Sequence, residues 1–214
     1  MADREEAVVK ELLARHPDSY AAEAGIRLAD RPSPLYQLLV LATLLSARIS
    51  ADIAVAAARE LSAAGYRTPA AMAAASWQDR VDALGRAHYR RYDERTATML
   101  GRGAELLTSR WRGDLRRLRD EAGGNADRIA ALLTEFPGIG PSGADIFVRE
   151  VQAVWPSVFP RTDARVLEGA GKVGLPGDPA ALARLAGSGP RLAHLAAALV
   201  RASRSRRVAS GRDR

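Results

Sequence analysis

The chain has 214 residues, a net charge of +7 at neutral pH and no cysteine. Its length allows one sizeable hydrophobic core or two closely joined lobes, and the lack of cysteine excludes disulfides, thiolate-bound zinc, iron–sulfur clusters and thiol nucleophiles. Only three histidines are present, far apart in the sequence, so a transition-metal site is not expected.

The N-terminal part of the chain predicts helices rather than a signal peptide or a membrane span. Residues 1–10 are charged and have no apolar signal-peptide core, and 4–16 places its apolar residues on one helical face. The most apolar stretch, 35–47, is too short for a bilayer and includes Gln37, so it predicts a buried helix that Pro34 opens. We therefore expect a cytoplasmic protein.

Helical signals continue through the rest of the chain, whereas strand patterns are nearly absent. Asp52 is expected to begin or support a helix that Gly65 ends, and Thr68 and Ser76 are expected to cap the next two helices. Prolines make 155–162 an irregular connection. Further helices are predicted in five segments, namely 92–111, 127–136, 141–154, 163–175 and 189–203. The sequence thus predicts an all-α protein.

A glycine corner interrupts the helices at residues 136–147, which read FPGIGPSGADIF. Gly138 and Gly140 allow a tight turn with positive φ and a close approach by another backbone. Free N–H groups at the start of the next helix, with the helix dipole, can then bind an anion such as a phosphodiester. Taken alone, the same pattern is also typical of an ordinary corner between two helices.

The surroundings of this corner carry a family resemblance. The segment LLTEFPGIGPSGADI resembles the helix–hairpin–helix of the endonuclease III superfamily of DNA glycosylases (HhH-GPD), whose hairpin reads Leu-Pro-Gly-Val-Gly. Asp163 follows where this family has an aspartate that opens the next helix, and 34–50 and 92–107 resemble two earlier helices of the family. The resemblance runs in order from about residue 33 to 175.

The resemblance implies an all-α fold of two lobes with the active site in the cleft between them. Residues 33–135 are expected to form a helical bundle. The second lobe is expected to combine 1–32 with 136–203 and to carry the catalytic aspartate, with the helix–hairpin–helix at about 127–154. Residues 204–214 are expected to be a basic, disordered tail, which could strengthen nonspecific phosphate contact or only solubilise the chain.

The aspartate of this family has a chemical role in breaking the N-glycosidic bond. After the base has been rotated out of the duplex, an ionised carboxylate stabilises the oxocarbenium-like sugar and can orient or deprotonate a water. The resemblance assigns this catalytic role to Asp163. By itself, an aspartate between a loop and a helix also predicts an N-cap, and the two roles can coexist.

The residue at position 142 bears on the reaction type. Bifunctional members of the family have a lysine at the position of Ser142, and its amine forms a Schiff base with the sugar. A serine cannot do so, and the resemblance therefore implies a monofunctional DNA N-glycosylase that excises a damaged base in base excision repair, without efficient AP lyase activity. The adenine-mismatch branch needs a glutamate that 38–50 lacks, whereas the alkylpurine branch has a loop similar to SARIS (46–50), which favours an alkylated base.

Further residues are implied to contact DNA. Arg48 is where the family commonly has a residue that fills the gap left by the flipped base, although an exposed arginine at a helix end has the same sequence pattern. Tyr89, Tyr92 and Trp77 could line a base pocket with their aromatic faces, or they could pack in the core or at its rim. The hairpin residues expected to bind DNA are Gly138, Ile139, Gly140, Ser142 and Gly143.

The expected partner is damaged double-stranded DNA, bound by a monomer. No cofactor is expected, because the ligands of the family's iron–sulfur cluster are absent; the resemblance implies only a monovalent cation held by hairpin carbonyls. Two other functions also fit the sequence. One is a noncatalytic helix–hairpin–helix protein that recognises bent or branched DNA, and the other is a helical protein-interaction module in which the glycine corner is only a turn.

Overall fold

The protein is built from short helices, and the computed structural model describes its residues 2–204. Within them are thirteen α-helices, one 3-10 helix and no β-strand, which confirms the all-α prediction. The expected tail lies outside the described residues except for Arg204. The helices are α1 (Ala2–Arg15), α2 (Tyr20–Glu23), α3 (Pro32–Ser46), α4 (Ala51–Ala63), α5 (Pro69–Ala74), α6 (Trp77–Arg86), α7 (Asp93–Trp111), α8 (Leu115–Glu121), α9 (Ala126–Leu133), α10 (Pro141–Val151), the 3-10 helix η1 (Pro156–Val158), α11 (Ala164–Val173), α12 (Pro179–Ala186) and α13 (Gly189–Arg204).

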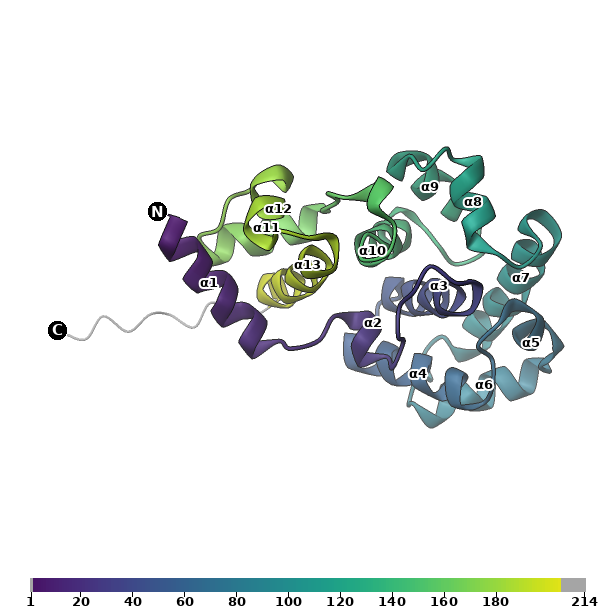
Figure 1. The fold of residues 1–214 in the computed structure, drawn as a ribbon. Coiled ribbons are helices and arrows are strands. Elements are labelled where there is room, and N and C mark those ends of the chain that lie inside the picture. Colours follow the sequence, from purple (N-terminus) through teal and green to yellow (C-terminus); the bar gives the residue numbers. More distant parts are fainter. Residues whose placement is uncertain (1, 205–214) are drawn as a thin grey trace.

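The helices form a smaller and a larger group (Figure 1). Helices α1, α11, α12 and α13 lie together on one side, and α3 to α9 lie on the other. Helix α10 lies between the groups and packs against α3, α9 and α13. The smaller group therefore combines the first helix of the chain with its last three, and α10 connects it to the larger group.

Side-chain caps determine where several helices begin. Ser50, Thr68 and Ser76 each precede a helix and accept a hydrogen bond from a backbone N–H in its first turn. The caps expected at Thr68 and Ser76 are confirmed. Helix α4, in contrast, is capped by Ser50. Asp52 lies in its first turn, where its negative charge interacts favourably with the helix dipole.

Helix α3 is the buried centre of the larger group. It begins at Pro32, two residues before the expected start at Pro34, because N–H groups in the first turn have no helical acceptor and prolines fit there. Leu38, Leu41 and Leu44 are fully buried, as expected for this segment, and α3 packs on α4 and α10. Within the described part of the chain, no helix is long and apolar enough to cross a membrane.

Helices α11 and α13 touch through a glycine. A Cβ atom at Gly169 of α11 would lie 2.0 Å from the backbone carbonyl oxygen of Leu199 in α13. Only glycine allows the two backbones to approach so closely. By comparison, a Cβ atom at Gly171, on the same helix, would meet nothing within 4 Å. Helix α11 thus has a fixed position on α13.

The glycine corner between α9 and α10 packs against the larger group. Gly138 has φ +87°, in the left-handed region that favours glycine. A Cβ atom there would lie 2.7 Å from the sulfur of Met99 in α7 and 3.4 Å from a side-chain methyl of Thr43 in α3. Gly138 is therefore required both for the turn and for its contact with α7, which fixes where α10 begins.

Candidate active site

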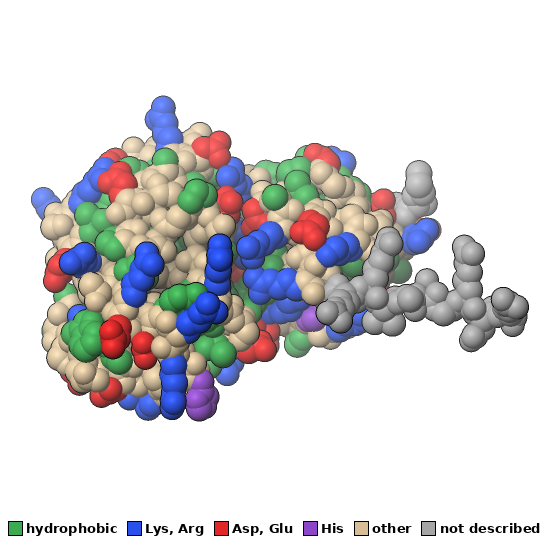
Figure 2. Space-filling view, turned by 180° about the vertical axis from the view of Figure 1, so that it is seen from behind, with side chains coloured by type: hydrophobic (Ala, Val, Ile, Leu, Met, Phe, Trp, Pro, Cys, Tyr) green, Lys and Arg blue, Asp and Glu red, His purple; other side chains and the backbone are tan. Residues whose placement is uncertain are grey.

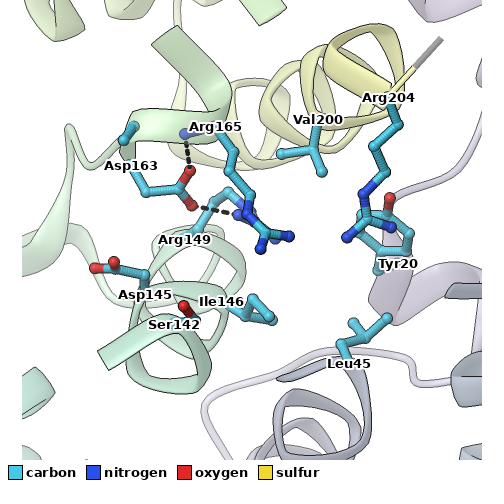
Figure 3. Close-up of a pocket in the computed structure, with 11 residues that line it drawn as sticks. Tyr20, Leu45, Ser142, Asp145, Ile146, Arg149, Asp163, Arg165, Val200 and Arg204 are labelled. Carbon is cyan, nitrogen blue, oxygen red and sulfur yellow. Dashed lines mark hydrogen bonds and ion pairs between the residues drawn. The ribbon is translucent and has the colours of Figure 1, made fainter. Parts of the chain in front are cut away.

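A pocket of about 140 Å³ lies where the two groups of helices meet (Figure 3). The larger group of helices contributes Leu45 of α3 to the pocket wall, and α10 contributes four residues, the first Ser142 and the last Arg149. Asp163 and Arg165, at the start of α11, form another part of the wall. The remaining lining residues are Tyr20, Asp145, Ile146, Ala164, Val200 and Arg204. Residues far apart in the sequence thus form a single cavity.

Asp163 is the N-cap of α11 and also lines this pocket. Its Oδ1 accepts hydrogen bonds from the backbone N–H groups of Arg165, at 2.9 Å, and Val166, at 3.1 Å. Its Oδ2 accepts a hydrogen bond from the guanidinium of Arg149. Only 8% of the Asp163 side chain is exposed. The carboxylate is therefore held in one orientation by the start of its own helix and by α10.

Arg149 is a site residue that the sequence reasoning missed. It lies in the buried part of α10 beside Phe147, Val148 and Val151, with 3% of its side chain exposed. Its Nε has no hydrogen-bond partner. Two adjacent charged residues, Arg149 and Glu150, in a mainly apolar helix segment were the available signal, because a buried arginine needs a carboxylate or another acceptor nearby. The sequence does not say which carboxylate this is.

The start of α10 differs from that of α11 because it has no side-chain cap. Gly140 is its N-cap, makes no side-chain hydrogen bond and is followed by Pro141. Ser142 is exposed and lines the pocket. The N–H groups of Ser142 and Gly143 lie in the first turn, where a helix has no acceptor for them. They are donors that can bind an anion at the edge of the pocket.

The other hairpin residues have structural contacts. Ile139 is buried, and its backbone N–H donates to the carbonyl of Phe136 at 3.0 Å. Gly143 is also buried, and a Cβ atom there would lie 3.3 Å from the Cβ of Ser46 in α3. Ile139 and Gly143 therefore shape the corner by packing, whereas Ser142, in the first turn of α10, is exposed.

Arginine side chains surround the opening of the pocket. Arg165 and Arg204 line it, and together with Arg48 they also line an adjoining hollow. Arg48 is exposed in the loop between α3 and α4. Figure 2 shows blue side chains gathered on one face where the larger and smaller halves of the molecule meet. This arrangement suits a polyanion that lies across both halves.

The three aromatic residues considered for a base pocket lie elsewhere. Tyr89 is fully buried, burial raises its pKa, and its hydroxyl accepts a hydrogen bond from Thr96. Trp77 is 40% exposed, and its ring N–H donates to Thr98 at 3.1 Å. Tyr92 is the N-cap residue of α7. The structure does not bring them to Asp163; the aromatic side chain that lines the pocket is Tyr20.

The donor groups of the chain limit the metals it can hold. Between residues 2 and 204, no group of three or more His, Asp or Glu side chains could hold a metal ion. The chain has no cysteine, so its residues do not fit an iron–sulfur cluster bound by thiolates. The pocket is instead lined by arginine, aspartate, serine and apolar side chains.

Comparison with known structures gives a match to the fold. No family model matches the chain, and no curated protein matches it significantly. The structure of a trapped endonuclease III–DNA covalent intermediate, in an estranged-adenine complex, is similar with a TM-score of 0.52. The two chains are 18% identical, and the match covers 94% of this chain and 84% of the other. The chain therefore has the all-helical fold of endonuclease III, as its resemblance to the helix–hairpin–helix superfamily predicted.

Proposed function

We propose that this chain is a monofunctional DNA glycosylase that hydrolyses the N-glycosidic bond of a damaged base during base excision repair. One observation carries the proposal: the Asp163 carboxylate lines the pocket at whose edge the uncapped start of α10 lies. A donor group for a backbone phosphate and a negative charge for the sugar are thereby held in one place. A cytoplasmic protein acting as a monomer fits this proposal.

DNA is the proposed partner. The fold is similar to that of endonuclease III, whose matched structure is a complex with DNA. The N–H groups at the start of α10 would hold a phosphate, and Arg48 would contact the duplex from the opposite side of the adjoining hollow. In this arrangement the extruded nucleotide enters the pocket with its sugar near Asp163.

The carboxylate of Asp163 would act on the sugar and on a water. Oδ1 already accepts two backbone hydrogen bonds, whereas Oδ2 accepts one, from Arg149. Each carboxylate oxygen can accept about two hydrogen bonds, so Oδ2 can accept one more, from a water molecule. That water is the nucleophile for C1′, and the negative charge stabilises the sugar as positive charge develops on it.

The absence of a lysine from the pocket lining supports a monofunctional reaction. Ser142 lines the pocket where a bifunctional enzyme would have its amine. Lys172 lies in α11 and forms an ion pair with Glu168 at 2.9 Å, and Lys10 is in α1; neither lines the pocket. The proposed product is therefore an abasic site on an intact strand.

No cofactor takes part in the proposed reaction. A monovalent cation bound by hairpin carbonyls fits as an aid to phosphate binding. The carbonyl of Gly138 accepts a hydrogen bond from the hydroxyl of Ser46 at 3.3 Å, and a carbonyl oxygen has a second lone pair. The catalytic step does not depend on this ion.

The direct test uses duplex oligonucleotides that each contain one lesion, either alkylated, deaminated, oxidised or mismatched. We expect the strand to break only after alkali treatment, because the enzyme leaves an abasic site. Strand scission without alkali, with an enzyme–DNA adduct trapped by borohydride, would contradict the monofunctional mechanism. If none of the lesions loses its base, the proposal that the protein is a glycosylase would be contradicted.

The ion pair of Asp163 favours one alternative function. Arg149 balances the carboxylate charge, and a protein that only binds bent or branched DNA would need Asp163 as a cap and nothing more. Such a protein would bind the duplex through α10 and the arginines and release no base from any lesion. Binding to four-way junctions or bent duplexes with no base release would therefore favour this alternative.

A further inference from the structure

The charges of the pocket indicate which kind of base it can release, and this inference rests on the proposed glycosylase function. Guanidinium groups of Arg149, Arg165 and Arg204 line the pocket (Figure 3). Arg149 is ion-paired with Asp163. Among the described residues, no carboxylate is paired with Arg165 or Arg204. Asp145, the second carboxylate of the lining, has an arginine partner outside the pocket at 3.5 Å. The pocket therefore has an excess of positive charge.

Such a pocket does not suit a cationic alkylated base. Purines methylated on a ring nitrogen carry a positive charge while attached to the sugar, and arginines around the pocket would repel it. A cation could instead be bound over an aromatic face. However, the guanidinium carbon of Arg201 lies 4.2 Å from the ring centroid of Tyr20, so a cation already covers one face of this ring. The alkylated base expected from the SARIS loop is thus disfavoured by charge.

The same arginines limit how a neutral base can leave. A guanidinium stays protonated at physiological pH, so it does not act as a general acid. It can, however, donate hydrogen bonds to carbonyl oxygens and stabilise negative charge. Bases such as adenine and cytosine, which leave more readily after protonation, gain little from it. A base with two ring carbonyls, such as uracil, gains most, because the negative charge left on its departing nitrogen spreads onto both oxygens.

We propose that the pocket releases neutral, carbonyl-rich bases, such as deaminated or oxidised ones, as anions stabilised by Arg165. The C1′–N bond breaks, and its electron pair remains on the base. Water adds to C1′, its proton passes to Asp163 and then to solvent, and the free base anion takes a proton from water. Arg165 contacts the carbonyl oxygen of the leaving base and is therefore a catalytic residue in this reaction.

The position of Arg165 follows from the turn that holds Asp163. Its backbone N–H donates to the Asp163 carboxylate at 2.9 Å, so both residues belong to the first turn of α11. Its side chain extends from this turn into the pocket (Figure 3). One turn of helix thus offers a negative charge to the sugar and a positive charge to the base. Each is opposite to the charge that develops as the bond breaks, which is positive on the sugar and negative on the base.

The substrate class is tested with matched duplexes that contain uracil, an oxidised pyrimidine or 7-methylguanine, incubated with the full chain and then treated with alkali. We expect release of uracil-like and oxidised bases and at least 10-fold slower release of 7-methylguanine, after subtraction of its spontaneous loss. Release of 7-methylguanine alone would overturn this inference and leave the glycosylase proposal standing. Release of no base at all would overturn both.

The role of Arg165 is tested with leaving groups of different quality. In Arg165→Gln we expect about 100-fold slower single-turnover release of uracil. The loss should be clearly smaller for 5-fluorouracil, because fluorine stabilises the anion without help from the protein. Arg48→Gln is the matched control: it removes an arginine outside the pocket and should weaken DNA binding without changing the ratio of the two rates. Equal losses for both bases in Arg165→Gln would overturn the assignment of Arg165.

Discussion

The starts of α10 and α11 face the same pocket and differ in how their N–H groups are used. Helix α11 is capped by the carboxylate of Asp163, which accepts hydrogen bonds from two of its N–H groups. Helix α10 begins at Gly140, which has no side chain to accept them. Arg149 of α10 connects the two, because its guanidinium pairs with the carboxylate that caps α11.

This difference shows how one structural element can serve two purposes. An uncapped helix start leaves donors for an anion from outside, such as a phosphate. A capped start has used its donors and presents an anion of its own to the pocket. In the proposed function, α10 binds the DNA backbone and α11 acts on the sugar.

The largest effect is expected from removing the charge at the start of α11. Asp163→Asn keeps a capping oxygen but loses the negative charge, so we expect base release to fall about 1000-fold while DNA binding persists. Arg149 would then be a buried charge without its ion-pair partner, which costs about 3 kcal/mol of stability. Single-turnover kinetics, binding assays and thermal melts measure the three quantities.

A double variant separates activity from stability. Asp163→Asn combined with Arg149→Gln removes both charges of the buried pair, so we expect most of the lost stability to return. Base release should stay as low as in Asp163→Asn, because the carboxylate is still missing. Base release at the wild-type rate in either variant would mean that Asp163 is only a helix cap.

The next effect concerns the position of α11 rather than its charge. Gly169→Ala would place a methyl group 2.0 Å from the Leu199 carbonyl oxygen, so we expect about 3 kcal/mol of destabilisation by denaturant unfolding. Gly171→Ala is the matched control, since nothing lies within 4 Å of its Cβ. It should stabilise the helix by about 0.5 kcal/mol. Similar values for both variants would show that the contact between α11 and α13 is looser than described.

A smaller effect is expected from giving α10 the kind of cap that α11 has. Gly140→Asp adds a carboxylate at a position with φ −94° and no atom within 4 Å of a Cβ. It would bind the free N–H groups and repel phosphate, so we expect DNA affinity to fall about 10- to 100-fold with stability unchanged or slightly raised. Gly140→Asn adds an uncharged cap and should lower DNA affinity less than Gly140→Asp does. Unchanged affinity in both variants would favour an ordinary helix corner.

The smallest effect involves Glu150, the neighbour of Arg149 on α10. Glu150 is fully buried, and one of its oxygens accepts a hydrogen bond from the Ala21 N–H in α2, at 3.3 Å. Burial raises its pKa, although Arg149 and Arg201 oppose the shift. Because the pKa of Glu150 is raised on folding, its protonated form contributes to stability. This contribution is fully present below the pKa of the unfolded chain, about 4.5, and is lost as the pH rises through the pKa of the folded protein.

Glu150→Gln should therefore stabilise the protein at pH 7 by about 1 kcal/mol and make no difference near pH 4. Thermal melts of the two proteins across this pH range measure the difference. A variant that is less stable than the wild type at pH 7 would show that the charges of Arg149 and Arg201 need this carboxylate.

The sequence predicts helices and caps well because these depend on neighbouring residues. The hairpin, the caps at Thr68 and Ser76 and the helix after Asp163 are all local patterns. The sequence does not predict three short helices, α2, α8 and α12, because each is at most eight residues long and therefore too short to give a clear apolar period.

The composition of the pocket was harder to predict because it depends on distant contacts. Tyr20, Arg149 and Arg204 meet only through the packing of α2, α10 and α13, and no local pattern connects them. Tyr89 illustrates the reverse case. Its aromatic ring allowed either a base-stacking role or a place in the core, and its side chain is fully buried in the larger group. The charge of the pocket therefore became visible only in three dimensions.

The glycine contact at Gly169 also restricts how the pocket can change under selection. Because α11 and α13 already touch backbone to backbone, α11, which carries Asp163 and Arg165, cannot move closer to α13 to widen the cavity. We therefore expect room for a bulkier base to come from the opposite side, near Leu45 and the following loop. In a laboratory evolution experiment for broader specificity, adaptive substitutions should accumulate in residues 45–49, while α11 stays unchanged.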